Sequence, residues 1–450
     1  MKQDYSGKTV IIVGAGRTGC SLVRYFLERA AAVTLSDARR AAEIAVPEEF
    51  MAAGVGLDLG GHAPALFAAA DLVVVSPGVP PDIPALRAAR NHRVPILGEI
   101  EIASRELEQP LVAISGTNGK STVTTLMGEM FRACGKRTFV GGNLGTPLIE
   151  AVGREWDWLV VELSSFQLET IENFRPQFGV LLNISEDHLD RYPDMRSYQA
   201  AKSRLFENMT TQDCVVLNAD DPLVMAAAGR TPARKVLFSG NRVLQEGMGI
   251  DDHWLVWNWR GGSQRFDARE LIIQGQHNLE NVMAAMIPPL LSGCPADAAW
   301  QAATSFRGLP HRMELVGDAC GLRWFNDSKG TNIGSVVKSL DGLAGPLTLI
   351  AGGKDKHGSL TPLMDQVRRK VDHLVLIGEA AERMARAFEG MTTIHRASSM
   401  GEAVRIAAEV TPSGGTVLLS PGCSSFDMFS NYGERGKVFA EAVAALAEVA

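Results

Sequence analysis

The stretch SGTNGKST, at 115–122, carries the clearest chemical signal in the chain. It lies between an apolar run, LVAI, and a segment typical of a helix, TVTTLMGEMFRACG. In a phosphate-binding loop, backbone N–H groups cradle phosphates, a lysine reaches the β- and γ-phosphates, and the next hydroxyl binds Mg²⁺. The first glycine of the usual pattern would fall at 114, where this chain has Ile114. The sequence therefore predicts an ATP site made by the working end of such a loop: Gly116, Thr117, Asn118, Gly119, Lys120, Ser121 and Thr122.

A second glycine loop, GAGRTG at 14–19, also stands between an apolar run and a helix-like segment. It satisfies G-x-G-x-x-G, and Asp37 ends the next predicted strand. In the dinucleotide fingerprint the glycines let the backbone approach a pyrophosphate, and the acid binds a ribose. Two interpretations stay open from these residues alone: an NAD-dependent oxidoreductase, or a tight turn that packs a helix on a strand without a ligand.

Two candidate metal ligands follow predicted strands downstream of the phosphate loop. Glu162 ends the run WLVVE, and His188 lies in NISEDHLDRY. Mg²⁺ keeps several waters, so one carboxylate and one imidazole are sufficient. Singly, Glu162 could be a solvated strand end and His188 the start of a helix, but their joint occurrence favours a magnesium site. The helical pattern of RSYQAAKSRLFENM predicts, by contrast, that Lys202 is an ordinary exposed lysine.

Other polar groups stand where nucleotides and small substrates bind. His277, Asn278 and Asn281 open an otherwise apolar helix in GQHNLENVMAA, where short polar side chains can contact a base. NDSKGTN and LSPGCSSFD both follow predicted strands, as binding loops do in open α/β sheets. The last third of the chain is therefore predicted to present a polar rim of its own.

The elements that must position these groups alternate short apolar runs with helix-like segments, which predicts parallel β/α winding. The stretch HWLVWNWRGGSQRFDARELIIQG differs, because its aromatic alternation predicts antiparallel strands. Three α/β domains, at 1–97, 98–307 and 308–450, are the prediction. No low-complexity linker or short-period repeat interrupts them.

Composition narrows the class of protein. The chain has 450 residues, of which 46% are hydrophobic and 21% charged, as in an ordinary globular protein of about three domains. A formal net charge of -7 argues against a general nucleic-acid or acidic-membrane binder. The absence of a signal peptide or a long apolar run predicts a cytoplasmic protein. The cysteines are scattered without a zinc-binding spacing, which fits a reducing compartment: Cys20, Cys134, Cys214, Cys294, Cys320 and Cys423.

The ordered motifs GTNGKST, GGNLG, ELSSFQLE, NISEDHLDRY, AAKSRLF, GQHNLEN, GLPHR, NDSKGTN and LSPGCSSFDMFSNYGERG resemble those of the Mur ligases over essentially the whole chain. The resemblance implies a Rossmann-like N-terminal domain, a central P-loop ATPase-type α/β domain and a Rossmann-like C-terminal domain. It implies an ATP-dependent ligase of peptidoglycan precursor synthesis, which joins D-glutamate to UDP-N-acetylmuramoyl-L-alanine through an acyl phosphate. The D-N-P-R motif of the diamino-acid-adding relative is absent, and GAGRTG and SDAR fit the D-glutamate-adding members better. The alternative within the family is L-alanine addition.

The same resemblance assigns roles to individual residues. Magnesium would be held by Ser121, Glu162, His188 and Lys202, with Lys202 carbamylated. The adenine pocket and the closing third domain would supply His277, Asn278, Asn281, Arg312 and Asp327. The uridine diphosphate would meet Arg17, Thr18, Asp37, Arg39, Ser76 and Gly78, with Asn143 and Gln167 further along the substrate. D-Glutamate would meet Lys329, Thr331, Lys356, Ser425 and Tyr432, with Lys354 as the alternative to Lys356. A monomer that binds neither nucleic acid nor membrane is expected.

Overall fold

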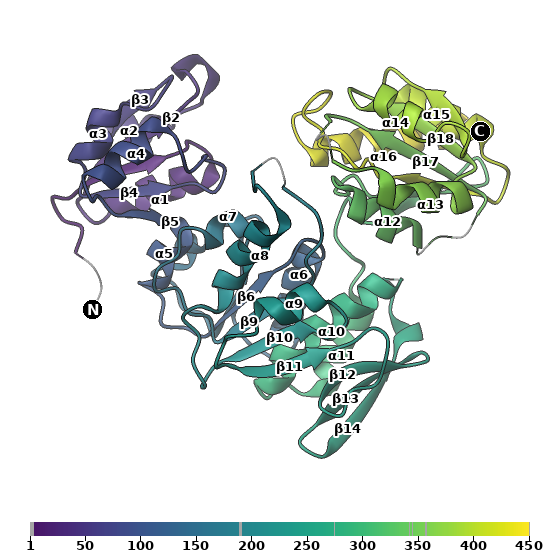
Figure 1. Cartoon of the computed structure of the whole chain (residues 1–450), viewed down its shortest axis with the longest axis horizontal. Coiled ribbons are helices and arrows are strands. Elements are labelled where there is room, and N and C mark those ends of the chain that lie inside the picture. The colour runs from purple at the N-terminus through teal and green to yellow at the C-terminus, as the bar shows by residue number, and fades with distance from the viewer. Residues whose placement is uncertain are drawn as a thin grey trace. The chain divides into compact units, whose positions relative to one another are not determined.

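The computed structural model describes residues 4–188, 191–273, 275–341, 343, 345–355 and 358–449. It contains three sheets, each built from its own section of the chain (Figure 1). The mixed α/β fold with mostly parallel sheets confirms the predicted fold class. The chain forms two compact units, of which the first comprises Met1–Ile184, Arg196–Ala268 and Glu280–Ala303. The second comprises Ser185–Met195, Arg269–Leu279 and Thr304–Ala450.

The first sheet is parallel and has the strand order β3-β2-β1-β4-β5. Its strands are β1 (Thr9–Val13), β2 (Ala32–Asp37), β3 (Gly56–Leu59), β4 (Leu72–Val75) and β5 (Ile96–Gly98). Its helices are α1 (Arg17–Leu27), α2 (Glu48–Ala52), α3 (Pro64–Ala69) and α4 (Pro84–Asn91). The GAGRTG loop joins β1 to α1, and a Cβ on Gly19 would come 1.8 Å from the Gly14 carbonyl oxygen. Only glycine therefore lets α1 start this close to the turn.

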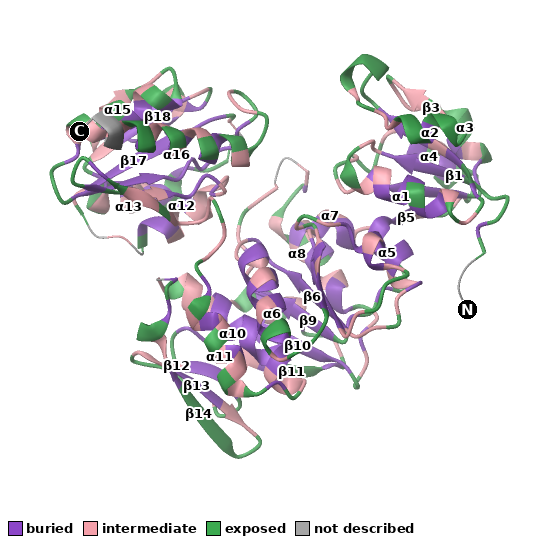
Figure 2. Cartoon of the chain, turned by 180° about the vertical axis from the view of Figure 1, so that it is seen from behind, coloured by how far each residue is buried: buried purple, intermediate pink, exposed green. Residues whose placement is uncertain are grey.

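The second sheet has nine strands in the order β14-β13-β12-β11-β10-β9-β6-β8-β7. Its bounds are β6 (Leu111–Ser115), β7 (Thr138–Gly142), β8 (Trp158–Glu162), β9 (Phe178–Leu181), β10 (Cys214–Asn218), β11 (Arg234–Phe238), β12 (Gly247–Asp251), β13 (Trp254–Trp259) and β14 (Gly262–Asp267). The strands from β7 to β12 run parallel, whereas β13 pairs antiparallel with both β12 and β14. The antiparallel pairing of β13 and β14 confirms the prediction for this patch, and β12 lies before the predicted stretch. In Figure 2 the central strands are buried and β14 is largely exposed.

The winding direction of this sheet reverses beside β6, because the chain passes from β6 to β7 and β8 on one side and then to β9 on the other. Crevices at the carboxyl ends of strands next to such a reversal are the usual ligand sites of open α/β sheets. The accompanying helices are α5 (Glu99–Ser104), α6 (Lys120–Ala133), α7 (Ser165–Leu168), α8 (Met195–Ser203), α9 (Pro222–Ala227), α10 (Gln276–Leu291) and α11 (Ala296–Ser305). The phosphate-loop sequence follows β6 and begins α6, as predicted.

The third sheet has the order β15-β16-β20-β17-β18-β19, with β15 antiparallel to β16 and the other pairs parallel. Its strands are β15 (Glu314–Ala319), β16 (Leu322–Asn326), β17 (Leu347–Gly352), β18 (His373–Ile377), β19 (Thr393–Arg396) and β20 (Thr416–Leu419). Its helices are α12 (Ile333–Asp341), α13 (Thr361–Lys370), α14 (Ala381–Ala387), α15 (Met400–Val410) and α16 (Tyr432–Val449). Because β16, β20 and β17 are neighbours, the loops that follow them leave one edge of the sheet together. Within the described residues, no helix has the length and apolar character needed to cross a membrane.

Candidate functional site

The phosphate loop is held in place by residues that follow β9 and by α8. The Thr117 N–H donates to the Asn183 carbonyl at 2.9 Å, and the Asn118 N–H donates to the Asn183 side-chain oxygen at 2.8 Å. The Thr117 hydroxyl lies 3.2 Å from the Tyr198 hydroxyl. Asn183 and Tyr198 had not been singled out from the sequence, although Asn183 is a polar residue directly after a buried strand, which is a usable signal.

Gly119 marks the tightest point of this loop. It has a φ of 85°, and a Cβ at this position would come 2.4 Å from the side-chain oxygen of Asn281. Another residue here would adopt a strained left-handed conformation and would displace the Asn281 side chain. Asn281, which was predicted to lie in the adenine pocket, is thus placed against the phosphate loop, and Ser121 and Thr122 are buried in the first turn of α6.

Two lysines donate to the same backbone oxygen. The Lys120 ammonium donates to the carbonyls of Gly116 and Thr117, both at 2.8 Å, and the Lys202 ammonium donates to Gly116 at 2.9 Å. Lys202 is only 1% exposed and lies 4.7 Å from the centre of the Tyr198 ring. The helical pattern had predicted an exposed Lys202, and that prediction is wrong because this face of α8 packs on the loop.

Glu162 ends β8 next to the loop and is buried. Its carboxylate accepts hydrogen bonds from the Ser121 hydroxyl at 2.5 Å and from the Asn143 amide at 2.7 Å. A buried carboxylate beside a hydroxyl is a set of hard oxygen donors, which fits the preference of Mg²⁺. No group of three His, Cys, Asp or Glu suited to a metal occurs in the part of the chain that the structure describes. This is compatible with Mg²⁺, which takes few protein ligands.

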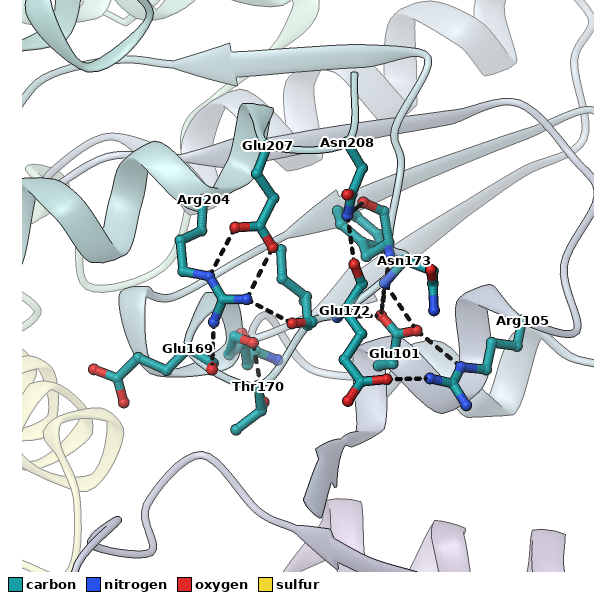
Figure 3. Close-up of polar contacts among 12 residues, drawn as sticks. Glu101, Arg105, Glu169, Thr170, Glu172, Asn173, Arg204, Glu207 and Asn208 are labelled. Atoms are coloured by element: carbon teal, nitrogen blue, oxygen red, sulfur yellow. Dashed lines mark hydrogen bonds and ion pairs between the residues drawn. The ribbon is translucent and has the colours of Figure 1, made fainter. Parts of the chain in front are cut away.

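The end of the helix that carries Lys202 is clamped to the segment after α7 (Figure 3). The Arg204 guanidinium donates to the carbonyls of Glu169 at 2.5 Å and Ile171 at 2.6 Å. Glu207, four residues past the end of α8, orients that guanidinium at 2.8 Å. The connection matters because α7 follows directly on the strand that ends at Glu162.

From α5, a buried carboxylate holds the other end of the same segment. Glu101 accepts backbone hydrogen bonds from Glu172, Asn173 and Phe174 at 2.9 to 3.1 Å, and Arg105 pairs with it at 2.8 Å. Burial alone would raise the pKa of this carboxyl, but the hydrogen bonds and Arg105 lower it overall. The segment 169–174 is therefore fixed from both sides.

Within α7, Gln167 forms a capping box with Ser164. The Gln167 side-chain oxygen accepts from the Ser164 N–H at 2.9 Å, and the Ser164 hydroxyl accepts from the Gln167 N–H at 3.2 Å. Gln167 was predicted to contact the substrate; its described contacts are those of a helix cap.

In the second compact unit, His188 adopts a φ of 57°, which is uncommon for histidine. Its Nε2 lies 3.7 Å from Asp187, whose carboxylate also accepts from the Asn332 amide at 3.1 Å. This segment belongs to the second unit, whereas Glu162 belongs to the first. A role of His188 in metal binding stays a prediction.

The predicted adenine-binding side chains start α10. Burial, with the Lys338 ammonium nearby, lowers the pKa of His277 to about 4, so its imidazole is neutral at pH 7. A neutral imidazole has one donor and one acceptor nitrogen, which is the capacity needed beside a base. The Asn278 N–H donates to the Gly275 carbonyl at 2.9 Å, in the first turn of the helix.

Asp327 lies directly after β16 and is buried. Its carboxyl accepts hydrogen bonds from the hydroxyls of Ser339 at 2.8 Å and Ser420 at 2.7 Å. Burial raises its pKa to about 6, against the opposing effects of these hydroxyls and of the Arg312 charge. A group tuned in this way in a loop after a strand is a candidate for a functional site.

The predicted amino-acid pocket gathers on loops of the third sheet. The Lys329 ammonium lies 4.0 Å from the centre of the Tyr432 ring, and the Thr331 N–H donates to the Lys329 carbonyl at 2.8 Å. Ser425 is buried, whereas Tyr432 is 37% exposed. Lys356 lies outside the described residues.

The first glycine loop is arranged around Asp37. Its carboxylate accepts from the Ala15 N–H at 2.7 Å and from the Arg39 guanidinium at 2.9 Å, and Arg39 holds the pKa of Asp37 far below its usual value. The Ser76 hydroxyl is buried and has no hydrogen-bond partner among the described residues, and it would lie 2.8 Å from a Cβ on Gly14. The other predicted contacts of this sheet are on or next to the surface: Arg17, Thr18 and Gly78.

Comparison with known proteins decides the family. Residues 8–98 match a model of the Mur ligase MurD-like N-terminal domain, 114–288 the Mur ligase middle domain and 311–423 the Mur ligase glutamate ligase domain. The chain belongs to the Mur ligase family.

Mur ligase relatives match along nearly the whole length. The UDP-N-acetylmuramoylalanine--D-glutamate ligase of Syntrophotalea carbinolica is 59% identical over 98% of this chain and 99% of its own. The ligase of the same name from Geotalea uraniireducens is 51% identical over 98% of each chain. A pseudomurein peptide ligase type C from Methanothermus fervidus shares the fold at 18% identity, with a TM-score of 0.62 over 98% of this chain and 100% of its own.

Proposed function

We propose that this Mur ligase joins D-glutamate to UDP-N-acetylmuramoyl-L-alanine, with ATP converted to ADP and phosphate. The observation that supports this choice of substrates best is the 59% identity, over nearly the full length, to a relative that bears this activity in its name. The family uses ATP and Mg²⁺. L-Alanine addition is the competing activity, and an oxidoreductase would explain the GAGRTG loop but not GTNGKST.

The chemistry requires that an anion attack an anion. A carboxylate oxygen of the UDP-linked substrate bonds to the γ-phosphorus, and the bond from that phosphorus to ADP breaks. The amine of D-glutamate then bonds to the acyl carbon, phosphate leaves with its oxygen, and the amine loses a proton to water. Mg²⁺, when bound, offsets the charge that gathers on the transferred phosphoryl group.

The residues of the loop supply the rest of this stabilisation. Lys120 donates to loop carbonyls and, at the start of α6, can turn to the β- and γ-phosphates. The loop N–H groups and the N-terminus of α6 also stabilise the negative charge of the phosphates. Ser121 and Glu162 would hold the metal, with Asn143 fixing the Glu162 carboxylate from its other oxygen. Stabilisation of the charge that develops during phosphoryl transfer is usually the largest single contribution to the rate enhancement.

We also propose that Lys202 works as a carbamate. Two unit positive charges about 4 Å apart repel by roughly 4 kcal/mol at an effective dielectric constant of about 20. Lys120 and Lys202 donate to one carbonyl oxygen, and Lys202 is buried, so a neutral or anionic Lys202 is favoured. Addition of CO₂ to the neutral amine gives an anion and a proton, and the anion can orient or bind the metal.

The remaining assignments follow the family pattern. The uridine diphosphate is proposed to bind at the first glycine loop near Asp37, Arg39 and Ser76, and D-glutamate at Lys329, Thr331, Lys356, Ser425 and Tyr432. The unpartnered Ser76 hydroxyl supports the first of these sites, because a buried hydroxyl normally has a partner. Domain boundaries near 97 and 307 are proposed with them.

A phosphate-release assay with a panel of amino acids tests the function. With ATP, Mg²⁺ and UDP-N-acetylmuramoyl-L-alanine, D-glutamate should stimulate release strongly, and L-glutamate, D-alanine and L-alanine should not. Phosphate release with UDP-N-acetylmuramate and L-alanine, but not with UDP-N-acetylmuramoyl-L-alanine and D-glutamate, would assign the alanine-adding activity instead.

A further inference from the structure

The first turn of α16 buries an arginine that belongs to the stretch LSPGCSSFDMFSNYGERG but was assigned no role from the sequence. Arg435 is 0% exposed. Its guanidinium makes five hydrogen bonds: to the Ser328 hydroxyl at 3.0 Å, the Ser328 carbonyl at 2.8 Å, the Cys423 carbonyl twice at 3.2 Å, and the Ser424 carbonyl at 3.2 Å. The four acceptor oxygens are neutral and three of them are backbone carbonyls of loops, so the side chain cross-links these loops.

The loops joined in this way are those proposed to hold the amino acid. Ser328 immediately precedes Lys329 in the loop after β16, and Ser424 immediately precedes Ser425 in the loop after β20. The Ser328 hydroxyl also donates to the Tyr432 carbonyl at 2.8 Å. One guanidinium therefore fixes the spacing between the two loops and the start of α16.

A third loop, after β17, is tied to the same point. The Lys354 N–H donates to the Ser424 carbonyl at 2.9 Å. A Cβ on Gly353 would lie 3.1 Å from Nη1 of Arg435 and 2.4 Å from that same carbonyl oxygen, so this loop approaches as closely as a glycine allows. The loops of three neighbouring strands thus meet around Arg435.

A buried cation is costly, and the charges of Asp427 and Asp327 offset only part of the cost of burying this one. Among the residues that the structure describes, no acid forms an ion pair with Arg435, and burial lowers its pKa to about 10. An apolar side chain of similar length would avoid the cost of desolvation but could not satisfy the loop carbonyls. The planar fork of arginine is suited to bridging several fixed acceptors, whereas a lysine is a point donor.

We propose that Arg435 is a positioning residue for the incoming amino acid, which sets the mutual placement of the loops that carry Lys329 and Ser425. The proposal rests on the proposed function. Asp327, on the nucleotide side of the same loop, has its own hydrogen bonds from Ser339 and Ser420. Loss of Arg435 should therefore weaken use of D-glutamate far more than use of ATP.

The test compares Arg435→Ala and Arg435→Lys with Lys370→Ala. Lys370 is a matched control, because its ammonium also donates to backbone carbonyls of this domain, those of Leu340 at 2.8 Å and Asp341 at 3.1 Å. It ends α13, before β18 begins, and so lies away from the three loops. Melting temperature and the KM values for D-glutamate, ATP and the UDP-linked substrate are measured for each variant.

Both Arg435 variants should raise the KM for D-glutamate at least tenfold and change that for ATP less than threefold, while Lys370→Ala lowers the melting temperature without changing either KM. Millimolar guanidinium should lower the raised KM of Arg435→Ala only. Arg435→Lys keeps the charge but cannot span the loops, so a wild-type KM for D-glutamate in this variant would overturn the proposal. Equal rises in the KM values for D-glutamate and ATP would overturn it as well. If Arg435→Ala does not fold, Arg435→Lys decides alone. Wild-type protein that shows no D-glutamate-dependent phosphate release would overturn the proposed function itself.

Discussion

At the scale of single residues, the carbonyl oxygen of Gly116 is the meeting point of two lysines that arrive by different routes. Lys120 reaches it from the start of its own helix, and Lys202 from α8, about eighty residues later in the chain. Lys120 is partly buried and borders the loop, whereas Lys202 is closed off from solvent. The two lysines thus share one acceptor oxygen but differ strongly in their exposure to water.

Lys202→Ala should therefore be nearly inactive with a folded structure close to that of the wild type. A carbamate is a carboxylate-like anion, so millimolar acetate or formate should restore part of the turnover of this variant. Lys202→Arg serves as the control, because arginine keeps a charge and cannot form a carbamate, and it should not respond to the acid. Turnover near the wild-type level in Lys202→Ala would end the proposal that this lysine takes part in catalysis.

At the scale of elements, the segment 169–174 links the helix that carries Lys202 to the strand that carries Glu162. Arg204 clamps this segment from one side and Glu101 from the other. Small displacements of a reacting group cost much rate, about a hundredfold for 1 Å in unfavourable cases. The clamp is thus expected to influence turnover although none of its side chains contacts the phosphate loop in the described structure.

Arg204→Met should lower kcat at least about tenfold, with a smaller effect on the KM for ATP, because Lys202 loses its fixed position. Arg137→Met is the matched control: Arg137 pairs with Glu155 at 2.7 Å just before β7, outside the segment that Arg204 and Glu101 hold. Both variants should lose some thermal stability, and only the first should lose turnover. Equal kinetic effects of the two changes would show that the clamp has a general structural role only.

The sequence was sufficient to predict those elements whose local pattern decides them. The loop between β6 and α6, the antiparallel pair of β13 and β14 and the strand end at Glu162 all follow from local spacing of apolar and polar residues. The burial of Lys202 does not, because its helix has polar residues on more than one side and only the packed phosphate loop decides which face is covered. The role of Arg435 is equally hidden, since its partners are backbone atoms of loops about ten and a hundred residues away.

For the whole molecule, the open question is which ligand the first glycine loop binds, because its glycines suit two different ligands. Both a nicotinamide dinucleotide and a uridine diphosphate present a pyrophosphate to the same backbone amides. A ligand that binds only the folded chain stabilises it by about 2.7 kcal/mol at a hundred times Kd. UDP-N-acetylmuramoyl-L-alanine should raise the melting temperature clearly, UDP less, and NADH not at all at matched concentration. A shift with NADH alone would reassign this loop to a redox cofactor.

The central claim is that the carboxylate of the UDP-linked substrate is activated as an acyl phosphate, and the fate of its oxygen tests this most directly. UDP-N-acetylmuramoyl-L-alanine labelled with ¹⁸O in the carboxylate is incubated with the protein, ATP, Mg²⁺ and D-glutamate, and the released phosphate is examined by mass spectrometry. Each phosphate should carry one carboxylate oxygen, because the attacking oxygen leaves with the phosphorus when the amide forms. Unlabelled phosphate released together with the amide product would contradict the claim.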